Sequence, residues 1–148
     1  MLRIIKPVLL SFIVLYVAFS GLTNANNIHD PKYRFKEVMG EYELKLFRSI
    51  ILTNYSCKYA KGKFGLDLYN NNLNNLTEEI IKSFTLYGTK KQKKYILDKA
   101  LIKERELAYK FADKKGKRFM LSYCLRENHN ALHEYPEILE SYTLKKIY

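Results

Sequence analysis

Two cysteines, Cys57 and Cys124, constrain this chain most strongly, because they are the only cysteines among its 148 residues. Cys57 lies in the stretch RSIILTNYSCKYAKG, and Cys124 lies in MLSYCLRENHNALHEYP, which also contains His129 and His133. Three roles are open to them: a disulfide, a zinc site completed by histidines, or a Cys/His nucleophile pair. The compartment in which the chain folds decides among these roles.

The first 25 residues have the layout of a secretory signal peptide. Arg3 and Lys6 form a short positive region, residues 8–19 are almost entirely apolar, and Thr23 and Ala25 place small residues at a cleavage site. The apolar run is shorter than the roughly 20 residues that span a bilayer, so we expect cleavage near Ala25 rather than a retained anchor. The sequence therefore predicts a signal peptide over residues 1–25 and one exported domain over residues 26–148.

Export favours a disulfide between Cys57 and Cys124, because an oxidising compartment pairs an even number of cysteines. A zinc site using His129 and His133, which are four residues apart, remains an alternative. A Cys/His nucleophile pair would leave the other thiol unpaired. The bridge would close a loop of 67 residues, for which chain entropy alone predicts about 4 kcal/mol of stabilisation.

Apolar residues recur at helical spacing along the exported part, which predicts an all-α fold of four to six helices. We expect helices to start near Tyr33, at Thr77 as N-cap, at Lys90 and at Phe119, and a last amphipathic piece over residues 138–148. The helix from Lys90 should run unbroken to residue 112, and Gly88 should end the helix before it. Residues 66–76 remain ambiguous, since their leucines have helical spacing but weak helix formers separate them.

The same spacing predicts the core. The helix from Phe35 should pack against the helix from Phe119, and five side chains should be buried there: Ile50, Ile51, Phe119, Met120 and Tyr123.

Composition and motifs favour binding over catalysis. The formal net charge is +11 and falls to about +9 when the signal peptide is removed, but lysines occur in every segment, so we expect no nucleic-acid partner. The chain has no Gly-rich phosphate loop, HExxH or GxSxG motif. His129 and His133 are best interpreted as solvent-facing or capping groups. We expect no catalytic residue, metal or cofactor, and the basic surface is either merely solvated or faces an acidic protein.

The order of features resembles the type VI secretion amidase immunity proteins over the whole exported span. An apolar run from Ile50 ends at Cys57 and is followed by Lys58-Tyr59-Ala60 and, further on, by Asp67. A middle helix then runs through Tyr95, Ile96 and Leu107. After it, a Lys/Gly turn leads to the stretch YCLRENHNAL of residues 123–132. This last stretch is similar to the family's cysteine helix. Asn128 stands where the family has Tyr, Asn130 stands where it has Ser, and Tyr69 with three following asparagines replaces its small residues.

The resemblance implies a periplasmic, non-enzymatic homodimer that binds and occludes a peptidoglycan-cleaving amidase, with no membrane contact once the signal peptide is removed. The turn over residues 112–118 is the candidate inhibitory segment, through Lys114, Lys115, Lys117 and Arg118; the alternative is an ordinary solvated turn. Two rival functions remain: another exported helical binding protein, such as a lysozyme-type inhibitor or a periplasmic chaperone, and a small secreted hydrolase using His129 or His133. A neighbouring gene for a small Cys/His amidase would favour the immunity function over these two rivals.

Overall fold

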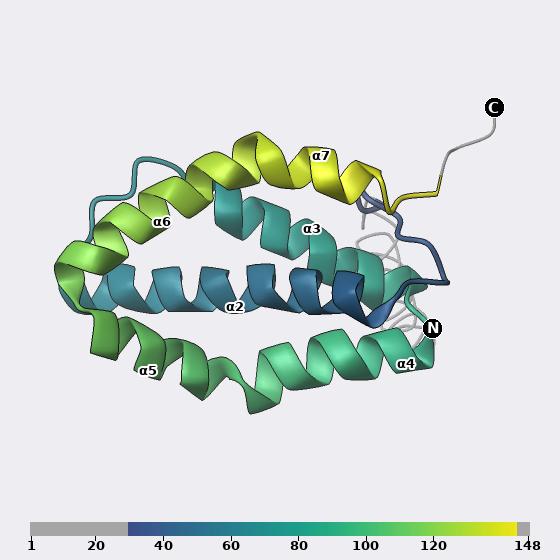
Figure 1. The fold of residues 1–148 in the computed structure, drawn as a ribbon, viewed down its shortest axis with the longest axis horizontal. Coiled ribbons are helices and arrows are strands. Elements are labelled where there is room, and N and C mark those ends of the chain that lie inside the picture. Colours follow the sequence, from purple (N-terminus) through teal and green to yellow (C-terminus); the bar gives the residue numbers. More distant parts are fainter. Residues whose placement is uncertain (1–29, 145–148) are drawn as a thin grey trace, which may run out of the picture. The chain divides into compact units, whose positions relative to one another are not determined.

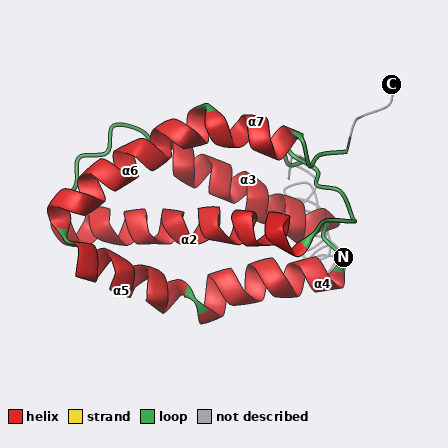
Figure 2. Cartoon of the chain, viewed as in Figure 1, coloured by secondary structure: helices red, strands yellow, loops and turns green. Residues whose placement is uncertain are grey.

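The computed structural model describes residues 30–144, of which residues 31–144 belong to one compact unit (Figures 1 and 2). The expected signal peptide, residues 1–25, lies outside the described residues, as do the last four residues of the expected C-terminal piece. The described part is all-helical, with six α-helices and one π-helix: α2 (Glu41–Phe64), α3 (Asn72–Tyr87), α4 (Lys90–Lys93), η1 (Lys94–Lys103, the π-helix), α5 (Arg105–Lys115), α6 (Lys117–Leu132) and α7 (Glu134–Glu140). The predicted fold class is confirmed.

Helix α2 is the centre of this unit. It contacts α3, η1, α5 and α6, and α6 in turn contacts α3 and α7. In Figure 1 the series α4–η1–α5 runs along one side of α2, and α6 and α7 run along the other. Among the described helices, none combines the length and apolar character needed to cross a bilayer.

The predicted disulfide joins α2 to α6. Cys57 and Cys124 are bonded and buried, and their Cα atoms are 5.7 Å apart, within the usual range for a disulfide. Both sulfur atoms are therefore occupied, so the Cys/His zinc site and the Cys/His nucleophile pair are excluded.

The predicted core is confirmed at three of its five positions. Ile50, Ile51 and Met120 are buried, but Phe119 is 42% exposed and Tyr123 is only half-buried. These two rings lie instead at the α5–α6 junction, where each packs against Phe111 at centroid distances of 6.2 and 5.6 Å. The prediction that Phe119 and Tyr123 are buried in the core is therefore wrong.

The expected helix start near Tyr33 is wrong, because the chain from residue 31 to residue 36 is extended. Tyr33 and Phe35 are buried while Arg34 between them is exposed, which is the period-two pattern of a strand. Phe35 forms an isolated antiparallel bridge with Thr143, and α2 begins only at Glu41. The bridge brings the N-terminal segment onto the core, where the Phe35 ring stacks on Phe47 with centroids 4.5 Å apart.

Helix α3 begins earlier than predicted. It starts at Asn72, so Thr77 is not its N-cap but lies inside the helix, where its buried hydroxyl donates to the carbonyl of Leu73 at 2.8 Å. This is the usual way in which an interior threonine satisfies its hydroxyl. The predicted end at Gly88 is confirmed.

The single helix expected from Lys90 to residue 112 is interrupted. The π-helix η1 ends at Glu104, whose N–H donates to the carbonyl of Lys99, five residues back, at 2.8 Å. A π-turn changes the rotation per residue. The side chains of α5 therefore point in directions different from those they would have in an unbroken α-helix. Leu107 is consequently 62% exposed, whereas Ala108 is buried against α2.

Candidate functional site: a cationic tip between α5 and α6

The predicted binding turn lies where α5 and α6 meet end to end. Gly116 separates the two helices, with φ of 83°, a conformation that favours glycine. The four predicted residues, Lys114, Lys115, Lys117 and Arg118, flank it and are all exposed. We call these four residues the cationic tip.

The α5 side of the cationic tip is held by α2. The hydroxyl of Tyr59 donates to the carboxylate of Asp113, at 2.9 and 3.0 Å from its two oxygens, and Lys63 forms an ion pair with the same carboxylate. The hydrogen bond from Lys63 lowers the pKa of Asp113, and Asp113 in turn raises the pKa of Lys63. Asp113 therefore stays ionised and keeps the end of α5 beside α2. Sequence analysis missed this anchor, since the partners are 50 or more residues apart and show no local pattern.

The α6 side is held by aromatic packing. The rings of Phe119 and Tyr123 stack with centroids 5.6 Å apart, and Phe111 meets both edge-on. The ammonium group of Lys115 lies 5.0 Å from the Phe119 ring centroid, in cation–π range. Cys124, the residue after Tyr123 on α6, is fixed by the disulfide. The tip thus has both ends restrained.

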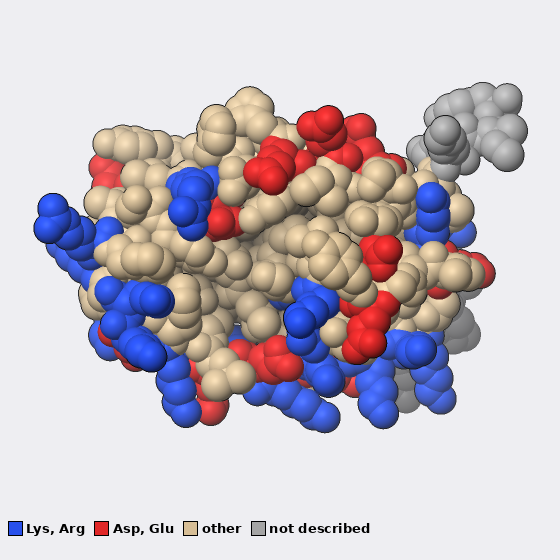
Figure 3. Space-filling model, viewed as in Figure 1, with Lys and Arg blue, Asp and Glu red and all other residues tan. Residues whose placement is uncertain are grey.

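The positive charge is gathered rather than spread evenly. Residues 90–118 contain 12 Lys or Arg and four Asp or Glu, whereas residues 119–144 contain one Arg and four Glu. Figure 3 shows the cations along the edge formed by α4 to α5 and at the tip, and carboxylates near α7 at the opposite edge. The lysines present in every segment of the sequence therefore do not give a uniform surface.

His129 and His133 are exposed, as predicted. They lie at the end of α6 with ring centroids 4.6 Å apart. Within residues 30–144, no cluster of three or more His, Cys, Asp or Glu side chains has the arrangement of a metal site.

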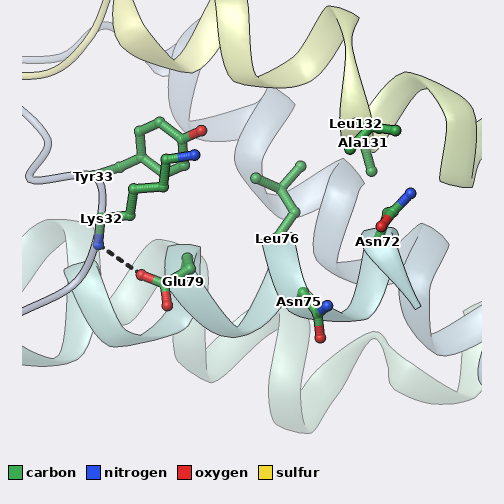
Figure 4. Close-up of a pocket in the computed structure, with 8 residues that line it drawn as sticks. All are labelled: Lys32, Tyr33, Asn72, Asn75, Leu76, Glu79, Ala131 and Leu132. Atoms are coloured by element: carbon green, nitrogen blue, oxygen red, sulfur yellow. Dashed lines mark hydrogen bonds between the residues drawn. The ribbon is translucent and has the colours of Figure 1, made fainter. Parts of the chain in front are cut away.

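A separate small hollow lies between α3, α6 and the extended N-terminal segment (Figure 4). Its volume is about 180 Å³, and its lining includes the amides of Asn72 and Asn75 and the side chain of Leu132. The N–H of Lys32 donates to Glu79 at 2.7 Å across one end. Sequence analysis missed this hollow because it depends on the extended segment, which was predicted to be helical.

The fold and the tip define a small, disulfide-linked, all-α protein that presents a restrained cationic turn. Comparisons of the chain with known protein families, with curated proteins and with solved structures find no match.

Proposed function

We propose that this chain is a periplasmic immunity protein that binds and occludes a peptidoglycan-cleaving amidase of type VI secretion. The observation that supports this most is the cationic tip: four exposed cations on a turn whose two ends are restrained. The choice of an amidase as the partner rests on the resemblance of the cysteine helix to that of the amidase immunity family.

A cleft-blocking protein gains from such a turn. A segment that already has its bound conformation loses little entropy when it binds, and here Asp113 and Phe119 restrain the two sides. The exposed ammonium and guanidinium groups complement an acidic cleft rim and speed association by electrostatic steering. On this proposal the chain acts by binding alone, as a homodimer, with no catalytic step and no cofactor.

The test measures binding to a purified peptidoglycan-cleaving amidase of type VI secretion. Replacing Lys114, Lys115, Lys117 and Arg118 together with Ser should weaken binding at least tenfold, or about 1.4 kcal/mol, without changing the melting temperature. A matched control removes the same charge elsewhere, with Ser at four other exposed cations: Lys32, Lys45, Lys58 and Lys82. If the tip variant and the parent chain bind the amidase with equal affinity, the binding site lies elsewhere. The next candidate is the helix face around Lys103 and Glu106.

A pull-down from the cell's own envelope extract, read by mass spectrometry, tests the class of partner. Capture of an amidase supports immunity, whereas capture of a lysozyme would favour the other exported inhibitor. Light scattering on the purified chain tests the proposed homodimer by its mass.

A further inference from the structure

The outer side of α4, η1 and α5 forms a second cationic surface, distinct from the tip. It lies opposite the buried side chains of Ile96 and Ala108. We call it the basic face; it consists of the exposed side chains of Lys91, Lys94, Lys99, Ile102, Lys103, Leu107 and Lys110.

The charge of this face is not neutralised by its own helices. Of the four carboxylates in residues 90–118, Glu104 pairs with Arg48 of α2 at 3.5 Å, and Asp113 pairs with Lys63 of α2. Asp98 and Glu106 are exposed, and these two negative charges are outnumbered by the surrounding lysines. Among the residues that the structure describes, none of the five lysines of the basic face takes part in a salt bridge.

Two aliphatic side chains project among these lysines. Ile102 is 71% exposed and Leu107 is 62% exposed, on either side of the break at Glu104. Exposed aliphatic groups surrounded by lysines are the pattern of a helix that rests on a lipid surface.

The face also contains a hollow suited to an anion. It has a volume of about 180 Å³ and is lined by Lys91, Lys94, Lys99 and Lys103 around the Tyr95 ring, with Asp98 at its margin. The ammonium group of Lys99 lies 5.4 Å from the Tyr95 ring centroid, so the ring supports a cation at this position. Four lysine side chains border this hollow, so their ammonium groups can reach a phosphodiester headgroup at its mouth.

We propose that the basic face binds the surface of a bilayer rich in anionic phospholipid, with Ile102 and Leu107 entering its interfacial layer. All five cations of the basic face are lysines. Protein interfaces are depleted in lysine and enriched in arginine, whereas diffuse attraction to anionic lipid works with lysine. The sequence had suggested no membrane contact for the exported chain, and this proposal departs from that expectation.

The charge distribution also fixes an orientation. Glu134, Glu137 and Glu140 of α7 lie in the segment with excess negative charge, on the other side of α2 from the basic face. An anionic surface attracts one edge and repels the other. The exported chain would thus rest on the membrane along α4 to α5 and turn α7 away from it.

The test is cosedimentation of the exported chain with vesicles. Vesicles of equal parts phosphatidylethanolamine and phosphatidylglycerol should bind it at low salt, and pure phosphatidylcholine vesicles should not. Replacing Lys91, Lys94, Lys99, Lys103 and Lys110 with Gln should weaken binding at least tenfold. A control with the same loss of charge, Gln at Lys32, Lys45, Lys58, Lys61 and Lys82, should stay within about threefold of the parent.

The double change Ile102→Ser and Leu107→Ser separates insertion from charge alone. It should also weaken binding about tenfold, with an unchanged melting temperature because both side chains are exposed. Three outcomes would overturn the proposal: equal weakening by the two Gln variants, equal binding to phosphatidylcholine vesicles, and full binding by the Ser variant. Absence of vesicle binding, with the face contacting an acidic protein instead, would also overturn it.

Discussion

The side-chain oxygen of Asn128 on α6 accepts the backbone N–H of Leu73, 3.0 Å away, at the start of α3. The first N–H groups of a helix have no partner within it, and here one partner comes from another helix. The amide nitrogen of Asn128 donates to the carbonyl of Cys124 at 2.9 Å, so both ends of this buried amide are satisfied. The residue that departs from the amidase-immunity pattern thus has a structural role in this chain.

Asn128→Ala should lower the free energy of unfolding by about 1–3 kcal/mol, because the N–H of Leu73 would be left buried without an acceptor. Urea denaturation measures this. Asn75→Ala, on the exposed side of α3, is the control and should change stability by less than about 0.5 kcal/mol. Equal effects of the two substitutions would show that the Asn128 bond adds nothing.

Replacing Cys57 and Cys124 together with Ala should cost about 2–5 kcal/mol, since the disulfide restricts a long loop in the unfolded chain. Guanidinium denaturation of this variant beside the oxidised parent gives the difference. Two thiols titrated in the denatured, non-reduced parent would contradict the bond itself.

Ile51→Ala should cost about 2–5 kcal/mol, because the Ile51 side chain is fully buried and its removal leaves a cavity. The matched control is Ile102→Ala, the same substitution at an exposed position, which should stay within about 0.5 kcal/mol. Thermal unfolding of both variants distinguishes a core position from a surface one.

Two glycines near the end of α2 should respond to alanine with opposite signs. Gly65 ends the helix with φ of 62° and ψ of 43°, so Gly65→Ala should cost about 1 kcal/mol although there is open space around it. Gly62 lies inside the helix with open space around it, and Gly62→Ala should add about 0.5–1 kcal/mol. Loss of stability at both positions would contradict this assignment of the helix end.

Stability should fall as the pH rises above about 10. Burial, and then the hydrogen bond that Tyr135 donates to Glu127, raise the pKa of Tyr135 above its usual value of 10.0. Above this value the unfolded chain loses the phenolic proton while the folded chain keeps it, which favours unfolding. The contribution is complete below pH 10 and is lost as the pH approaches the raised pKa.

Tyr135→Phe should make that alkaline decline shallower, as read from unfolding curves at a series of pH values. Tyr69→Phe is the control, since Tyr69 is exposed, and should leave the decline unchanged. The assignment of a half-buried, hydrogen-bonded Tyr135 fails if the alkaline decline is the same in the two variants.

The parts of the fold that sequence analysis predicted depend on signals within one segment or on chemistry set by the compartment. Helical spacing was sufficient for the all-α class and for burial of Ile51 and Met120. An even cysteine count with a predicted signal peptide was sufficient for the disulfide. The exposed cations of the tip follow from the Lys/Gly composition of the turn.

The errors arise where distant residues decide the local structure. Phe35 fits a helical stripe in sequence, but pairing with Thr143 holds it extended. Thr77 has the chemistry of an N-cap, yet Asn128 supplies an acceptor one turn earlier, at Leu73. Nothing local marks the π-helix that exposes Leu107, so neither the break at Glu104 nor the basic face could be predicted.

The bridge between Phe35 and Thr143 makes the N-terminal segment depend on residues made more than 100 positions later. The N–H of Lys36 bonds to the carbonyl of Tyr142, and the Tyr142 ring meets Phe47 edge-on with centroids 5.8 Å apart. A chain that emerges N-terminus first reaches these partners only after all the described helices have been made. A product that stops before residue 142 would therefore keep an unpaired backbone edge beside its aromatic core. We expect proteases to degrade such a truncated product faster than the parent chain.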